Sequence, residues 1–217
     1  MSRAGSGEWD WDAFYAKHRQ PKNQVDSGRR VARLLESYFK SEGVSVSSLA
    51  DVGCGPATTL FELAQRSPDI DLFGYDSSRT ILEKDHRRAA RLKLDNLHFG
   101  FAELPRLAIG RKFDVVICLA TLHYVEDPGR AIRSLHSIVE PGGHLIFNYP
   151  NNVQRAATAS EAEKDPVVSK RFALVLAGRN LLTRDVIAGT LGRRPESFWK
   201  AVGEPPRRLN PCVVITK

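Results

Sequence analysis

Short apolar runs alternate with segments of helical periodicity along most of this chain of 217 residues. The runs are rich in β-branched and aromatic residues, which is typical of strands, and they lie at 44–52, 70–76, 96–102, 112–122 and 144–150. Between them, apolar residues return at every third or fourth position, which predicts amphipathic helices at 58–66, 77–93 and 127–143. Strands that alternate with helices predict an α/β fold with a doubly wound, parallel sheet.

The same kind of pattern extends to both ends of the chain. Further elements are predicted as helices at 9–19, 25–43, 167–178 and 181–192, and as two closing strands at 196–203 and 210–217. Residues 151–166 are polar and are typical of a loop or a weak helix. We find no internal repeat and expect a single domain over residues 1–217.

Charge and composition narrow the class of protein. The net charge is +7, and basic residues fall in short groups such as 192–194 and 205–208. These groups indicate either solvated surface or a surface for an acidic partner, such as nucleic acid, a phosphorylated metabolite or a cofactor carboxylate. Aromatic residues are not interleaved with them, which weakens the interpretation as a nucleic-acid surface.

The sequence also indicates a compartment. No apolar run approaches the roughly 18–20 residues that span a membrane, and the N-terminus lacks the apolar segment of a signal peptide. The three cysteines are odd in number and contain no CxxC pair, which argues against a disulfide framework. We therefore expect a cytoplasmic protein without a membrane partner. The six histidines lack the spacing of metal ligands, so no metal is expected.

A turn with two glycines, Gly53 and Gly55, joins the first predicted strand to the helix at 58–66. In doubly wound sheets, ligands bind beyond the carboxyl ends of the strands, where this turn lies. A dinucleotide-binding turn would place a third glycine at position 58, which is Thr58. Asp51, just before the turn, would repel a phosphate and attract an ammonium group.

Four segments in chain order resemble the successive motifs of the class I S-adenosylmethionine-dependent methyltransferases. They read DVGCGPATTL, LFGYDSS, FDVVICLATLHYVEDP and LHSIVEPGGHLIF, between residues 44 and 150. The chain departs from the family's usual pattern at Ala57, where glycine is common. The resemblance implies a Rossmann-like sheet of seven strands with an antiparallel last strand. It also implies an enzyme that uses S-adenosyl-L-methionine and releases S-adenosyl-L-homocysteine.

The resemblance divides the chain into three parts. Residues 1–45 would hold N-terminal helices that form a lid, or a helix that only packs. Residues 46–150 would form the cofactor-binding core. Residues 151–217 would supply an insertion on the acceptor side and the closing strands.

The resemblance assigns roles around the glycine turn. Asp51, directly or through water, would face the ammonium group of the cofactor, and the backbone of Gly53 and Gly55 would lie against its methionine part. Asp76 would accept hydrogen bonds from both ribose hydroxyls, because an ionised carboxylate has two acceptor oxygens. Its structural alternative is to cap the following helix. The cofactor-binding set also includes Cys54, Ser77 and Leu119.

Two further regions carry candidate residues. For the adenine ring, Phe101 would stack, the backbone N–H of Ala102 would donate, and Glu103 would bind the amino group or simply face solvent. His123 is the candidate general base, because its pKa lies near working pH. The alternative is a structural histidine.

Three functions remain open. The first is transfer of a methyl group to O or N of a small-molecule acceptor. The second is methylation of RNA, as by transfer-RNA methyltransferases, which the basic charge favours. The third is a non-catalytic relative that binds the cofactor or a partner, against which the intact glycine turn and Asp76 argue.

Overall fold

A computed structural model describes residues 9–17 and 22–217 of the chain. Residues 18 and 19, which the sequence assigns to the first helix, lie outside the described residues. The described residues form one sheet of seven strands in the order β3-β2-β1-β4-β5-β7-β6. The strands are β1 (Ser48–Val52), β2 (Asp71–Asp76), β3 (Leu97–Phe101), β4 (Phe113–Cys118), β5 (Val139–Asn148), β6 (Glu196–Ser197) and β7 (Cys212–Thr216).

Strands β1 to β5 are parallel, and β7 runs antiparallel to both β5 and β6. This arrangement confirms the predicted Rossmann-like fold with an antiparallel last strand. The strand order reverses between β1 and β4, which are neighbours in the middle of the sheet. In this class of sheet, the point of reversal is where ligands bind.

Helices cover both faces of the sheet, so the central strands are buried on both sides. Along β4, Val115 and Ile117 pack on one face and Val116 and Cys118 on the other. The first face is covered by α2 (Lys22–Ser41), α3 (Thr58–Arg66) and α4 (Arg79–Leu92), and the second by α5 (Pro128–Ser137) and α9 (Arg184–Leu191). This two-sided burial explains why β4 reads as a continuous apolar run.

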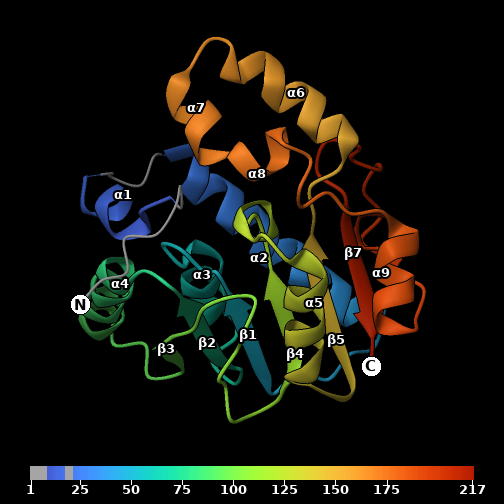
Figure 1. Cartoon of the computed structure of the whole chain (residues 1–217). Coiled ribbons are helices and arrows are strands. Elements are labelled where there is room, and N and C mark those ends of the chain that lie inside the picture. Colours follow the sequence, from blue (N-terminus) through green and yellow to red (C-terminus); the bar gives the residue numbers. More distant parts are fainter. Residues whose placement is uncertain (1–8, 18–21) are drawn as a thin grey trace.

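The carboxyl edge of the sheet carries the remaining helices. Helices α6 (Asn152–Ala162), α7 (Pro166–Arg171) and α8 (Ala173–Leu176) lie above it in Figure 1, and α1 (Trp11–Lys17) lies beside the start of α4. The polar segment after residue 150 is helical. Asn151 is the N-cap of α6, and its side chain accepts a hydrogen bond from Gln154 N. The helix predicted at 167–178 is two short helices.

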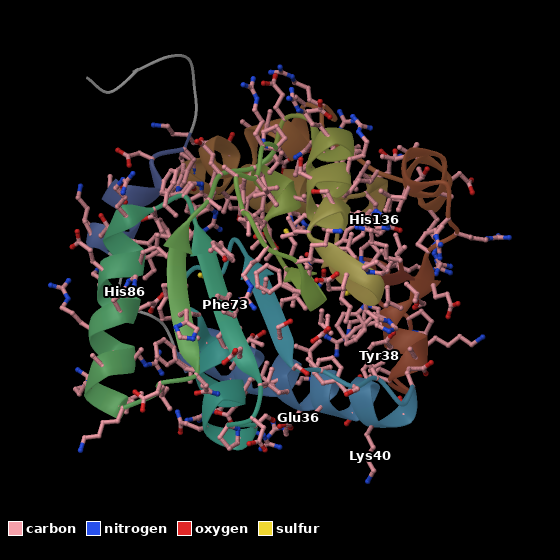
Figure 2. All side chains as sticks on the ribbon, turned by 90° about the horizontal axis from the view of Figure 1, so that it is seen from below. Glu36, Tyr38, Lys40, Phe73, His86 and His136 are labelled. Atoms are coloured by element: carbon pink, nitrogen blue, oxygen red, sulfur yellow. The ribbon has the colours of Figure 1, made fainter. Side chains whose placement is uncertain are left out.

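The opposite edge is seen from below in Figure 2, where α2 carries Glu36, Tyr38 and Lys40. Tyr38 Oη lies 2.9 Å from His144 Nδ1, and Glu36 forms an ion pair with Arg66 of α3 at 2.6 Å. These contacts tie α2 to the sheet and to α3. The site is therefore expected at the other edge, where the carboxyl ends of the parallel strands lie.

Two predicted boundaries are wrong. The helix predicted at 127–143 ends at Ser137, and the Pro141–Gly142 stop lies inside β5 instead. Gly142 has φ +82° and donates its N–H to Lys217 O at 3.0 Å, so this part of the strand bends while it pairs with the end of the chain. Turn residues inside a strand mark such a bend, and the sequence pattern alone assigns them to a helix end.

The closing strand predicted at 196–203 is also wrong beyond its second residue. Of the residues in this predicted strand, only Glu196 and Ser197 pair with β7. Phe198–Ala201 form a helical turn, α10. Phe198 and Trp199 are both buried although they are adjacent. Adjacent buried residues are expected of a strand covered on both faces, and here a turn of helix at the edge of the sheet achieves the same burial.

Candidate functional site

The glycine turn after β1 uses its N–H groups within the protein. Gly53 and Cys54 donate to Tyr75 O at 2.7 and 3.0 Å, and Gly55 donates to Asp76 Oδ2 at 2.9 Å. Pro56 has no N–H, and Ala57 donates to Cys54 O at 2.9 Å. A phosphate cradle needs free backbone N–H groups that point at the ligand. The turn therefore lacks the donors of a dinucleotide pyrophosphate site.

Neighbouring protein atoms leave no room for a side chain at Gly53 or Gly55. A Cβ at Gly53 would lie 2.2 Å from Thr121 Oγ1, and one at Gly55 would lie 2.8 Å from Tyr15 Oη. Both residues also have positive φ, +80° and +50°, which glycine adopts without steric cost. The turn is thus packed between the segment after β4, through Thr121, and helix α1, through Tyr15.

Two buried carboxyl groups lie next to this turn. Asp51, at the end of β1, is 6% exposed, and Asp76, at the end of β2, is 8% exposed. Burial, with a smaller contribution from the charge of Asp76, raises the pKa of Asp51 to about 8. Burial also raises the pKa of Asp76, although N–H donors from Ser78 and Gly55 oppose that rise. A cation placed here would stabilise both carboxylates.

Asp76 joins the turn to the helix that follows β2. Its Oδ2 accepts from Gly55 N and its Oδ1 from Ser78 N, both at 2.9 Å. Ser78 is the N-cap of α4 and accepts from Ile81 N, while Ser77 lies partly buried between the two. Asp76 therefore supports the start of the helix without being its cap. Each carboxylate oxygen retains a further lone pair for a ligand.

Helix α1 is docked on the same helix start. Asp12 Oδ1 accepts from Ser78 Oγ at 2.6 Å and from Thr80 N at 2.9 Å, and these donors lower the pKa of Asp12. Lys84 Nζ donates to Tyr15 O. Sequence reasoning missed Asp12, because its partners lie more than sixty residues away. The contacts place α1 beside the glycine turn, a position compatible with both expected alternatives, a lid and a helix that only packs.

An aromatic cluster continues from α1 across the carboxyl edge. The Trp11 and Tyr124 rings are 4.7 Å apart, and the Tyr124 and Phe172 rings are 5.3 Å apart. Tyr124 belongs to the short helix η1 (Leu122–Tyr124) after β4, and Phe172 joins α7 to α8. Helix α1 thus contacts η1, on which the junction of α7 and α8 also packs.

Of the three residues expected around adenine, Phe101 and Glu103 are exposed and Ala102 is buried. Phe101 is 47% exposed, and the guanidinium of Arg79 lies 4.6 Å from its ring centre. Ala102 N donates to Asp76 O at 3.2 Å, so the prediction that this N–H is available to adenine is wrong. Ala102 is the last residue of the predicted run 96–102, and its N–H extends the pairing of β3 with β2. Glu103 is exposed and bridges to Arg106 in the backbone, as the solvent-facing alternative expects.

The segment after β4 approaches the same edge. Leu119 is partly buried, and Ala120 has φ +57° while its N–H donates to Asn148 Oδ1 at 2.6 Å. Thr121 Oγ1 donates to Gly53 O at 3.3 Å. This segment is therefore bonded to the glycine turn on one side and to the end of β5 on the other.

His123, the middle residue of η1, is 4% exposed and faces α6. Its Nε2 lies 2.9 Å from Gln154 Oε1, so Nε2 carries the proton and Nδ1 keeps its lone pair. Within the described residues, Nδ1 has no hydrogen-bond partner. Burial lowers the pKa of His123, which keeps the ring neutral. Asn180, fully buried, donates to His123 O at 2.8 Å and holds the segment in place.

Among residues 9–17 and 22–217, no three His, Cys, Asp or Glu side chains form a group able to hold a metal ion. In the same part of the chain, no helix has the length and apolar character needed to cross a bilayer. The chemistry available at the carboxyl edge is therefore that of two buried acids, a neutral imidazole and an aromatic wall.

Comparison with known proteins gives a consistent assignment. The family model described as "Methyltransferase domain" matches residues 45–183. The chain is 31% identical over 137 residues to trans-aconitate 2-methyltransferase of Methylobacterium radiotolerans, covering 58% of this chain and 51% of that protein. It is 26% identical over 114 residues to ubiquinone biosynthesis O-methyltransferase of Acinetobacter baumannii, covering 52% of this chain and 47% of that protein. The chain spans about half the length of the curated relatives it matches.

A solved structure shares the fold over nearly the whole chain. Magnesium protoporphyrin IX methyltransferase of Synechocystis PCC 6803, crystallised with bound SAH, superposes with a TM-score of 0.64 at 17% identity. The match covers 95% of this chain and 92% of that one. With the sequence motifs, the sheet order and the family match together, the chain belongs to the class I S-adenosylmethionine-dependent methyltransferases.

Proposed function

We propose that this chain transfers a methyl group from S-adenosyl-L-methionine to O or N of a small-molecule acceptor. The observation that carries the proposal is the pair of buried acids, Asp51 and Asp76, beside a turn whose N–H groups are already bonded. S-adenosylmethionine offers an ammonium group, a sulfonium charge and a ribose diol, and it has no phosphate. These groups fit an acidic site and do not need the missing phosphate cradle.

The described residues support distinct tasks at this site. Asp51 would hold the ammonium group, and Asp76 would accept from the ribose hydroxyls with the lone pairs that Gly55 and Ser78 leave free. The backbone of the glycine turn would lie against the methionine part. When bound, the cofactor supplies an electrophilic methyl group, and most of the work left to the protein is to position the acceptor.

The acceptor side is built from the segment after β4, the end of β5 and helices α6 to α8. His123 is the candidate general base through Nδ1, which is neutral and unbonded among the described residues. Comparing the pH dependence of transfer by the wild type and by His123→Gln measures this role; identical profiles would remove it. The small-molecule class is supported by the relatives, which are named for trans-aconitate and for ubiquinone biosynthesis.

Binding of the cofactor product is expected to release a proton. Asp51 has a pKa of about 8 in the free protein and is mostly protonated at pH 7. An ammonium group against Asp51 lowers that pKa, so the complex holds fewer protons than the free protein. Affinity for S-adenosylhomocysteine should therefore rise with pH, by up to about tenfold per unit, and level off above the free pKa. Calorimetry at pH 7 in two buffers of different ionisation heat should show release of close to one proton.

Asp51→Asn is the matched control for this experiment, because it keeps the size of the side chain and cannot titrate. It should remove most of the proton release and flatten the pH dependence, and any remainder belongs to Asp76 or to the ligand's own amine. Binding with the same proton release in both proteins would contradict the role of Asp51. A wild type that does not bind S-adenosylhomocysteine at any pH would contradict the proposed function itself.

A further inference from the structure

A pocket of about 170 Å³ lies where β5 ends and β7 begins. Its walls include three arginines and two large aromatic side chains: Tyr149, Arg184, Trp199, Arg207 and Arg208. These residues come from the end of β5, the first turn of α9, the α10 turn and the loop before β7. Among the described residues that line the pocket, none is acidic.

The pocket is held open by specific contacts rather than by a loose loop. Trp199 Nε1 donates to Asn210 O at 2.9 Å, and the Arg207 guanidinium lies 4.6 Å from the Trp199 ring centre. Asn151 Nδ2 donates to Arg208 O at 2.9 Å. The indole and the backbone around Arg207 and Arg208 are thus fixed before any ligand arrives, which lowers the entropic cost of binding.

The positive charge at the pocket is only partly neutralised. Glu204 lies 3.5 Å from Arg207, but it also pairs with Arg30 at 2.7 Å. Within the described residues, Arg184 and Arg208 form no ion pair, and both are exposed. Two arginines that share a hollow without a counter-charge are suited to an anion, which a guanidinium can bind with two parallel hydrogen bonds.

The pocket is connected to the segment after β4, which carries the candidate base His123. Asn148 Nδ2 donates to Asn210 Oδ1 in the loop before β7, while Asn148 Oδ1 accepts from Ala120 N after β4. Tyr149, the next residue, donates its N–H to Pro211 O at 3.3 Å and lines the pocket. A ligand in the pocket would therefore lie on the acceptor side of the sheet's carboxyl edge.

The volume limits what the pocket can take. At about 170 Å³ it is smaller than the usual site for a drug-sized ligand, so it fits a small anionic group. We propose that this arginine pocket binds the negatively charged group of the methyl acceptor, which is therefore a small organic anion bearing a carboxylate or a phosphate. The statement that the anion belongs to a methyl acceptor rests on the proposed function. The statement that an anion binds here rests on the pocket alone.

Calorimetry with two probes tests the pocket, citrate for the carboxylate and inorganic phosphate for the phosphate. The proteins are the wild type, Arg184→Gln and Arg208→Gln, with Arg87→Gln as the matched control on the exposed face of α4. One probe should bind the wild type saturably and identify the anion. Each pocket variant should weaken that binding by at least about tenfold, and Arg87→Gln should leave it unchanged.

Three results would overturn the inference. The first is that neither probe saturates the wild type. The second is that all three variants weaken binding equally, which would reflect the net charge of +7 rather than a site. The third is RNA binding that depends on Arg184 and Arg208 while neither small anion binds. Affinity for S-adenosylhomocysteine, measured on the same proteins, separates the two proposals. If it is present and equal in wild type and Arg184→Gln while the probes fail, only the pocket is refuted; if it is absent, the proposed function fails independently.

Discussion

Asp76→Ala is expected to weaken binding of S-adenosylhomocysteine by at least about tenfold. A hydrogen bond to a charged group contributes roughly 1.5–3 kcal/mol, and Asp76 would make two to the ribose. The substitution also removes the acceptor of Gly55 N, so the glycine turn loses a direct tie to β2. Titration calorimetry gives the affinity, and circular dichroism confirms that the variant is folded.

Asp71→Ala is the matched control for this prediction. Asp71 begins the same strand as Asp76, but it is exposed and lies at the opposite edge of the sheet. Its replacement should leave affinity for S-adenosylhomocysteine unchanged. Equal affinities for the wild type and Asp76→Ala would show that the carboxylate does not contact the cofactor.

Gly53→Ala is expected to lower the free energy of unfolding by roughly 2–5 kcal/mol. Part of this loss is the left-handed backbone, since Gly53 has φ +80°. The rest is steric, because the new Cβ would lie 2.2 Å from Thr121 Oγ1 and would push the segment after β4 away from the turn. Denaturant titration measures the loss, and affinity for S-adenosylhomocysteine should fall with it.

Gly192→Ala separates the two contributions. Gly192 also has positive φ, +66°, but a Cβ there would meet no described atom within 4 Å. Its replacement should cost only the backbone strain, about 1–2 kcal/mol, and should not change affinity for the cofactor product. If Gly53→Ala were no more destabilising than Gly192→Ala, the packing of the turn against Thr121 would be refuted.

The sequence predicts well those elements whose burial produces a local pattern of apolar residues. Strands β1 to β4 lie within the predicted runs, and α3 occupies the predicted range 58–66. The errors occur where distant partners decide the conformation. Pro141 and Gly142 lie in a strand because that strand pairs with the end of the chain.

The same distinction applies to the site. Asp51 and Asp76 follow from the rule that ligands bind at strand ends, and both are buried beside the turn. No local signal announces that Asp12 holds α1 on α4 or that Ala102 N is already bonded to Asp76 O. A resemblance to a family supplies positions along the chain, and the tertiary contacts decide which groups remain free for a ligand.

The basic residues illustrate a third case. Arg207 and Arg208 belong to a group that composition alone assigns either to solvated surface or to an acidic partner. The fold brings Arg184 to them and places all three around one pocket. This convergence on one small pocket favours a small anion over an extended nucleic-acid surface.

The central claim is transfer of a methyl group from S-adenosylmethionine to a small molecule. The most direct measurement incubates the protein with labelled S-adenosylmethionine and fractionated cell extract, with Asp76→Ala as the control. Label should appear in the small-molecule fraction with the wild type and be strongly reduced with the variant. Label confined to nuclease-sensitive material, or no transfer to any fraction by a protein that binds S-adenosylhomocysteine, would contradict the account.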